Sequence, residues 1–179
     1  MSPREDTITP VESITVRRTL TPRDPDGIAE LLGRVYSSEY GLHGPFRDSV
    51  RVEIEEALAR GWPDEVGAVW LVDAGGRLSG ALALTDEGGG VGHVRWFVLA
   101  PELRRRGLGR WLFGQLLAEA PSLGFHTLEL ETFSALEAAA RIYRDAGFRR
   151  VGARCRTDWG RPILDERYEL RLRPAAVAS

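Results

Sequence analysis

The chain has 179 residues, and its 24 basic residues, all of them arginine, nearly balance 26 acidic ones to give a formal net charge of −2. This balance argues against a protein that coats nucleic acid or an anionic membrane, so neither is expected as a partner. A hydrophobic fraction of 43% is that of a folded domain.

One domain is predicted over residues 13–173, between a flexible N-terminal arm at 1–12 and a flexible tail at 174–179. Cys155 is the single cysteine, which excludes an internal disulfide and argues against a cysteine-based metal site, so no metal is expected. The first residues lack the apolar segment of a signal peptide, and no run approaches the ~20 apolar residues of a membrane span. A cytoplasmic protein is therefore expected.

Hydrophobic periods of two and of 3.6 residues alternate along this domain and predict its strands and helices. They predict a strand at 13–20, helices at 26–38 and 45–60, and three strands joined by glycine-rich turns at 67–72, 78–85 and 93–99. Further along they predict helices at 107–120 and 135–146 around a strand at 127–133, and closing strands at 149–156 and 166–172. The result is a mixed α/β fold in which an antiparallel meander precedes a strand–helix–strand–helix unit.

The strongest chemical signal is the loop after the strand at 93–99. Pro101 stops the strand, and a short run leads directly into an amphipathic helix: Arg104-Arg105-Arg106-Gly107-Leu108-Gly109-Arg110. The glycines let several backbone N–H groups face one ligand, and the start of the helix adds the positive end of its dipole. Arginine supplies forked donors suited to phosphate oxygens. The loop therefore predicts a phosphate site, with neither the Walker A nor the Rossmann spacing.

Two stretches around this loop resemble a known family. Residues 94–112 resemble motif A of the GCN5-related N-acetyltransferases (GNAT), whose loop reads Q/R-x-x-G-x-G/A, and residues 128–133 with 138–148 resemble motif B, which ends A-x-x-x-Y-x-x-x-G-F. More narrowly, residues 36–41, 94–97 and 131–136 resemble the acetyltransferase domains fused to MarR-type regulators. The resemblance covers about residues 13–173 and implies the α/β GNAT fold, a mixed, mostly antiparallel sheet with splayed central strands flanked by helices.

The resemblance implies acetyl-CoA (coenzyme A) as the cofactor, bound where the strand at 93–99 splays from the strand at 127–133. The backbone of Phe97, Val98 and Leu99 would contact its acetyl and pantetheine groups. The loop amides would hold its pyrophosphate, from Arg104, Arg105, Arg106, Gly107, Leu108, Gly109 and Arg110. Many relatives carry an asparagine where this chain, which has none, has Leu136. Ser134 or Thr132 is expected to supply the missing polar contact.

Tyr143 matches the family tyrosine that lies near the thioester sulfur and contacts the cofactor. A phenol is protonated at neutral pH, so Tyr143 is predicted to give a proton to the departing thiolate. Its helical spacing from Leu136, Ala139 and Ala140 suits a core residue equally well.

Glu131 is the first candidate for the general base, because it lies near the expected gap and partial burial would raise its pKa. The alternative for Glu131 is a salt bridge to Arg95. Glu39 is the second candidate, with a solvated helix end as its alternative. Glu39, Tyr40 and Arg95 are predicted to bind the acceptor.

The sequence thus predicts an N-acetyltransferase that moves an acetyl group from acetyl-CoA to a primary amine of a small molecule or peptide by direct attack in a ternary complex. The alternative is a non-catalytic acyl-CoA sensor. Cys155 is expected far from motif A, so no covalent enzyme intermediate is predicted. A homodimer is possible through a free strand edge at 166–172. The absence of lysine and asparagine, which have A-rich codons, suggests a GC-rich bacterial genome.

Overall fold

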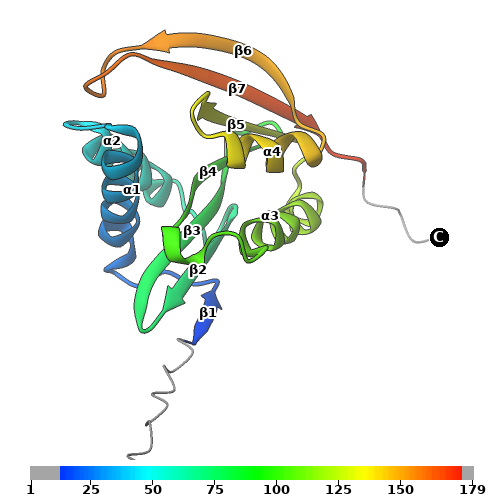
Figure 1. Cartoon of the computed structure of the whole chain (residues 1–179). Helices are drawn as coiled ribbons and strands as arrows, with labels where there is room; N and C mark the ends of the chain where they lie inside the picture. The colour runs from blue at the N-terminus through cyan, green and yellow to red at the C-terminus, as the bar shows by residue number, and fades with distance from the viewer. Residues whose placement is uncertain (1–12, 175–179) are drawn as a thin grey trace, which may run out of the picture.

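The computed structural model describes residues 13–174; the predicted arm at 1–12 and residues 175–179 of the predicted tail lie outside the described residues. Within this part of the chain, strands form one seven-stranded sheet in the order β1-β2-β3-β4-β5-β7-β6. Figure 1 shows α1 and α2 on one side of the sheet, α3 and α4 on the other, and the β6–β7 hairpin arching over α4. In the same residues, no helix combines the length and the apolar character needed to cross a bilayer.

The predicted helices and strands are confirmed, with small shifts at their ends. In chain order the elements are β1 (Ile14–Arg17), α1 (Asp24–Tyr40), α2 (Phe46–Ala59), β2 (Ala68–Ala74), β3 (Arg77–Asp86), β4 (Val91–Leu99), the 3₁₀ helix η1 (Pro101–Leu103), α3 (Leu108–Glu119), the 3₁₀ helix η2 (Ala120–Leu123), β5 (Thr127–Phe133), α4 (Glu137–Asp145), β6 (Arg149–Arg156) and β7 (Ile163–Arg171). Helix α1 starts two residues earlier than predicted because Pro25 suits a first helical turn. It ends at Gly41, whose φ of 65° favours glycine.

The two central strands, β4 and β5, separate partway along their length. They pair in parallel only from Val91↔Thr127 to Val94↔Leu130. The register between β3 and β4 then shifts, and Trp96 at the shift has a φ of 50°. A bulge of this kind bends its strand and increases the local twist, so the end of β4 turns away from β5. The predicted splay of the central strands is therefore present.

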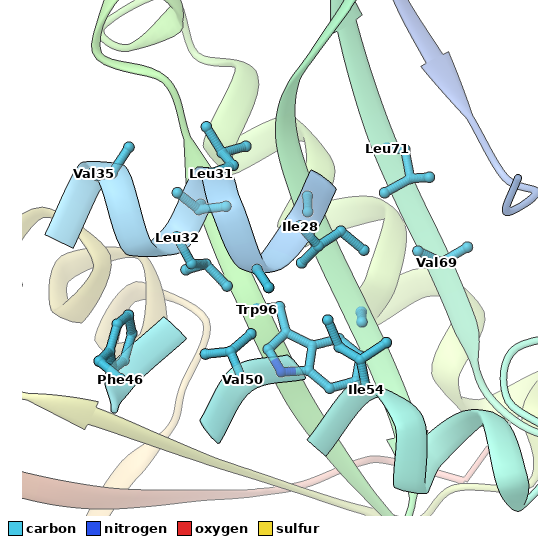
Figure 2. Packing of buried hydrophobic residues seen from close by; sticks show 14 of the residues in the cluster. Ile28, Leu31, Leu32, Val35, Phe46, Val50, Ile54, Val69, Leu71 and Trp96 are labelled. Carbon is cyan, nitrogen blue, oxygen red and sulfur yellow. The ribbon is translucent and has the colours of Figure 1, made fainter. Parts of the chain in front are cut away.

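Apolar side chains fill both faces of the sheet. On the α1–α2 face, Ile28, Leu32, Val50 and Ile54 pack with strand residues, and Figure 2 shows the Trp96 indole beside Val50 and Ile54. On the opposite face, residues of α3 pack against β5 and β3 in a second cluster, which includes Leu112, Phe113, Leu116, Leu128, Leu130 and Leu84. The gap between β4 and β5 is thus supported by a packed layer on each side.

The expectation that residues 166–172 offer a free strand edge is wrong. Strand β7 pairs with β5 along its length, from Thr127↔Arg171 to Phe133↔Asp165, and with β6 on its other side. Both hydrogen-bonding edges of β7 are therefore used inside the sheet. The outer edge at this end of the sheet is β6, whose residues are exposed from Arg149 to Cys155.

Replacing Ile54 by alanine should lower the free energy of unfolding by about 2–5 kcal/mol, because the side chain is fully buried and its loss leaves a cavity. Urea denaturation followed by tryptophan fluorescence measures this change. The matched control is Val52→Ala on the same helix, where the side chain is 51% exposed. The control should shift the free energy of unfolding by no more than about 0.5 kcal/mol. Equal losses in the two variants would contradict the assignment of Ile54 to the core.

Candidate active site

An open cleft of about 490 Å³ lies between the end of β4 and helix α4. Its walls come from Phe97, Val98 and Leu99 of β4, from the loop before α3, and from the first turns of α4. Tyr36 and Tyr40, at the end of α1, close one side. A cleft of this size falls in the range of small-molecule and cofactor sites, which is about 300–1,000 Å³.

The loop before α3 forms a concave array of backbone donors. Arg105 and Gly107 have positive φ angles of 61° and 77°, and α3 begins at Leu108 without a side-chain cap. Among residues 13–174, no backbone carbonyl outside the helix accepts a hydrogen bond from the N–H groups of residues 105–110, and the first turn of a helix leaves its own N–H groups unpaired. Alternating backbone conformations of this kind turn successive N–H groups toward one anion. The loop therefore has the donors that a pyrophosphate group needs.

The Arg104 side chain fixes this loop to the rest of the cleft. Its Nε donates to the carbonyl oxygen of Leu99 at 3.0 Å, and its Nη1 lies 2.8 Å from both carboxylate oxygens of Glu39. The contact joins the end of β4, the loop and the last turn of α1. Glu39, predicted to bind the acceptor, is thus paired with the loop, and it lines neither this cleft nor the cavity described next.

A second, smaller cavity of about 130 Å³ lies on the α2 side of the gap. Residues from α2, β4, β5 and the β6–β7 hairpin line it. Four residues line both the cleft and this cavity: Tyr36, Phe97, Leu136 and Tyr143. The two spaces therefore meet at these side chains, where β4 and β5 have already separated.

Tyr143 is buried at this junction. Its ring packs against Phe97, Phe113 and Phe148, with centroid distances of 6.4, 5.3 and 6.2 Å. The described residues give its hydroxyl no hydrogen-bond partner. The Tyr143 side chain lines both the cleft and the second cavity. Burial, with a smaller contribution from Tyr36, raises the pKa of Tyr143 far above its usual value. Its phenol therefore stays protonated throughout the working pH range.

The second cavity contains a carboxylate that the sequence analysis did not select. Glu53 of α2 is half-buried, and its Oε2 accepts hydrogen bonds from Trp96 Nε1 at 3.3 Å and Arg95 Nη1 at 3.5 Å. Burial raises the pKa of Glu53 above its usual value, although Arg95 and Trp96 oppose this shift. The feature of the sequence that could have pointed to Glu53 is its position three residues after the buried Val50, at the border of the apolar face of α2.

His93 also lines the second cavity, and burial together with Arg95 lowers its pKa to about 4. It is therefore neutral at neutral pH. Thr132 lines the same cavity from β5; its hydroxyl is buried, and no described residue is its hydrogen-bond partner. A buried hydroxyl without a partner is costly unless water or a ligand satisfies it.

The structure separates the remaining predicted site residues. Glu131 lines the second cavity but is exposed, and its nearest cation is Arg154 at 4.0 Å rather than Arg95. Arg95 instead reaches Glu53 and Glu87. Ser134 lines a different cavity, between α4 and the β6–β7 hairpin. Of the loop residues, Arg105, Gly107, Gly109 and Arg110 line the cleft along with Arg104, whereas Arg106 and Leu108 do not.

Comparisons with known proteins agree with this geometry. The model of the acetyltransferase (GNAT) family matches residues 30–148. An uncharacterized N-acetyltransferase of Escherichia coli (strain K12), YjgM, is 27% identical over 139 residues, which are 76% of this chain and 83% of that protein. The structure of YncA from Salmonella typhimurium with its cofactor acetyl-CoA has a TM-score of 0.67 at 18% identity and covers 93% of this chain and 98% of that one.

A further similar structure is spermidine N-acetyltransferase from Vibrio cholerae, in complex with CoA and spermine. Its TM-score is 0.63 at 21% identity, with 89% of this chain and 95% of that chain covered. At these identities the two structures share the fold of this chain.

Arg104→Lys should raise the Kd for coenzyme A by about tenfold or more, since hydrogen bonds to charged groups contribute about 1.5–3 kcal/mol and each ~1.4 kcal/mol is a factor of ten. Lysine keeps the charge but cannot donate to Leu99 and Glu39 at the same time. Isothermal titration calorimetry with coenzyme A measures the Kd. The control is Arg106→Lys, an equal change at an exposed side chain of the same loop. A Kd that is unchanged in both variants would show that the contact of Arg104 does not hold the loop in its binding shape.

Proposed function

We propose that this chain, which belongs to the acetyltransferase (GNAT) family, moves the acetyl group of acetyl-CoA to a primary amine of a small molecule or peptide by direct attack in a ternary complex. The observation that carries the proposal is the meeting of two cavities at Tyr36, Phe97, Leu136 and Tyr143. A donor in the cleft and an acceptor in the second cavity would face each other there, as direct transfer requires. Cys155, in the exposed β6, lines neither space.

The residues of the cleft fit coenzyme A. The N–H groups of the loop before α3 would hold the pyrophosphate, and the apolar walls at Phe97, Leu99 and Ile142 would contact the pantetheine arm. When bound, acetyl-CoA would supply an acetyl group already activated as a thioester. That YncA was solved with acetyl-CoA supports this assignment.

The protein's own groups would orient the reactants and handle the protons. The Tyr143 hydroxyl, kept protonated by burial, is the proposed donor of a proton to the leaving sulfur. Phe97 and Leu136 would exclude water from the junction of the two cavities. That the Vibrio cholerae structure contains CoA together with spermine supports an amine as the acceptor. The narrower likeness to domains fused to MarR-type regulators stays a prediction, as does a homodimer.

Release of free thiol from acetyl-CoA, measured with a panel of primary amines, tests the proposal. We expect release that depends on the amine, with the N-acetylated product identified by mass spectrometry. Tight binding of coenzyme A without release in the presence of any amine would contradict it. That outcome would favour an acyl-CoA sensor, for which the specific observation is Leu136 at the position where many members of the family carry asparagine.

Tyr143→Phe should lower kcat by about 10²-fold, the usual contribution of a general acid, and leave the Kd for coenzyme A nearly unchanged. Steady-state kinetics and calorimetry give the two values. Tyr168→Phe is the matched control, because Tyr168 is a buried neighbour whose hydroxyl donates to Glu166 at 3.1 Å and lines neither cavity of the proposed site. If Tyr143→Phe turns over at the wild-type rate, Tyr143 is a core residue and not the acid.

A further inference from the structure

The second cavity holds several carboxylates, and their surroundings differ. Asp165 is buried and contacts Arg154 at 3.2 Å and Arg156 at 3.6 Å, so its carboxylate is already paired with two arginines. Glu131 is exposed. Glu53 is half-buried, and both of its contacts use Oε2. The described residues give Glu53 Oε1 no hydrogen-bond partner, so this oxygen is available to a ligand in the cavity.

The strained backbone at Trp96 is what brings a donor to Glu53. A φ of 50° is rare for a tryptophan, and it puts Arg95 and Trp96, two consecutive residues, on the α2 side of β4. Without the bulge they would point to opposite faces of the strand. Trp96 Nε1 and Arg95 Nη1 then both hold Glu53 Oε2. Backbone strain that is retained to position a polar group is typical of functional sites.

We propose that Glu53 binds the ammonium group of the acceptor through Oε1 and takes its proton, and that the cavity around it selects small primary amines that arrive as cations. This assignment rests on the proposed function and identifies both its general base and its acceptor class. Glu53 replaces Glu131 and Glu39 in that role. Glu39 is held by Arg104 and lines neither cavity, and Glu131 is exposed with its nearest cation, Arg154, at 4.0 Å.

The charge and size of the cavity fit such an acceptor. Its two arginines, Arg95 and Arg156, each reach a carboxylate outside the lining: Glu87 at 3.1 Å and Asp158 at 2.5 Å. Their positive charge is therefore offset, which leaves the lining carboxylates to attract a cation. A volume of about 130 Å³ admits a short amine or the end of a longer chain. The buried Thr132 hydroxyl, which has no partner among the described residues, is placed to bond with a polar atom of that ligand.

The transfer balances with these groups. The acceptor ammonium gives one proton to Glu53 Oε1, and the freed electron pair of the nitrogen forms the N–C bond to the acetyl carbon as the C–S bond breaks. The sulfur takes the proton of the Tyr143 hydroxyl. The second proton lost by the nitrogen returns to the Tyr143 oxygen, and Glu53 releases its proton to solvent. The products are an amide, a free thiol and one proton.

The pH dependence follows from the groups that face Glu53. Burial is the largest influence and raises its pKa above the reference of about 4.3, with Glu131 acting in the same direction and Arg95, Trp96 and Arg156 opposing it. The charged or titratable neighbours across the cavity are His93, Arg95, Glu131, Arg156 and Asp165, together with the phenols of Tyr36 and Tyr143. As His93 titrates near pH 4, it is neutral where the enzyme works. Wild-type kcat/KM should therefore fall as the pH drops through the raised pKa of Glu53.

Glu53→Gln in the full chain tests the proposal with the best amine of the panel. At neutral pH its kcat/KM should be about 10²-fold below wild type, the usual contribution of a general base. The rate should recover as the pH rises toward the pKa of the acceptor, because the amine then arrives already deprotonated. Glu53→Asp, which keeps a carboxylate, should retain part of the activity. The Kd for coenzyme A should not change.

Glu56→Gln, the same substitution at an exposed position of α2, is the control and should match wild type. If Glu53 only supports the fold, Glu53→Gln loses activity equally at every pH and Glu53→Asp does not rescue it, which overturns the proposal. Wild-type activity in Glu53→Gln also overturns it and leaves the proposed function standing. Absence of turnover in the wild-type protein with every amine overturns the proposed function and this inference together.

Discussion

The bulge at Trp96 is the constraint on which the rest of the site depends. Strand β4 must stay paired with β3 up to Leu99 and yet leave β5 after Val94. The left-handed backbone conformation of Trp96 lets β4 stay paired with β3 and still separate from β5. This conformation costs about 1–3 kcal/mol for a residue other than glycine. Packing compensates for this strain: Trp96 is buried, and its ring meets Trp62 edge to face at a centroid distance of 5.1 Å.

The same bulge divides the chemistry of the site between two faces. Phe97 and Leu99 belong to the core cluster beneath α3 and α4, whereas Trp96 and Val98 belong to the cluster beneath α1 and α2. The basic loop and its N–H groups open on the first face. The carboxylates of the second cavity open on the other. One side of the gap is therefore basic, whereas the other combines carboxylates with Arg95 and Arg156, and the uncharged side chains of Tyr143, Phe97 and Leu136 separate the two sides.

Local features could be predicted from the sequence, whereas pairings between distant elements could not. The loop at 104–110 and the position of Tyr143 follow from short motifs, because a turn and a helix start are determined by neighbouring residues. The ion pair between Glu39 and Arg104 joins residues that lie 65 positions apart, and no local pattern reveals it. Glu53 borders the apolar face of its helix in the sequence, but its partner Trp96 points toward it only because of the bulge. Chain order also suggested that the last strand forms the edge, whereas β7 inserts between β5 and β6.

The absence of lysine has a structural counterpart in these contacts. Arg17 joins Asp24 and Asp73, Arg95 joins Thr85, Glu87 and Glu53, and Arg104 joins Leu99 and Glu39. In each case one planar guanidinium donates in two or more directions and links two or more elements. A lysine ammonium is a compact charge on a flexible stem and cannot hold such a fork in place. Two of these three arginines line the proposed site, Arg95 in the second cavity and Arg104 in the cleft. Arginine therefore links separate elements in this protein, in addition to supplying positive charge.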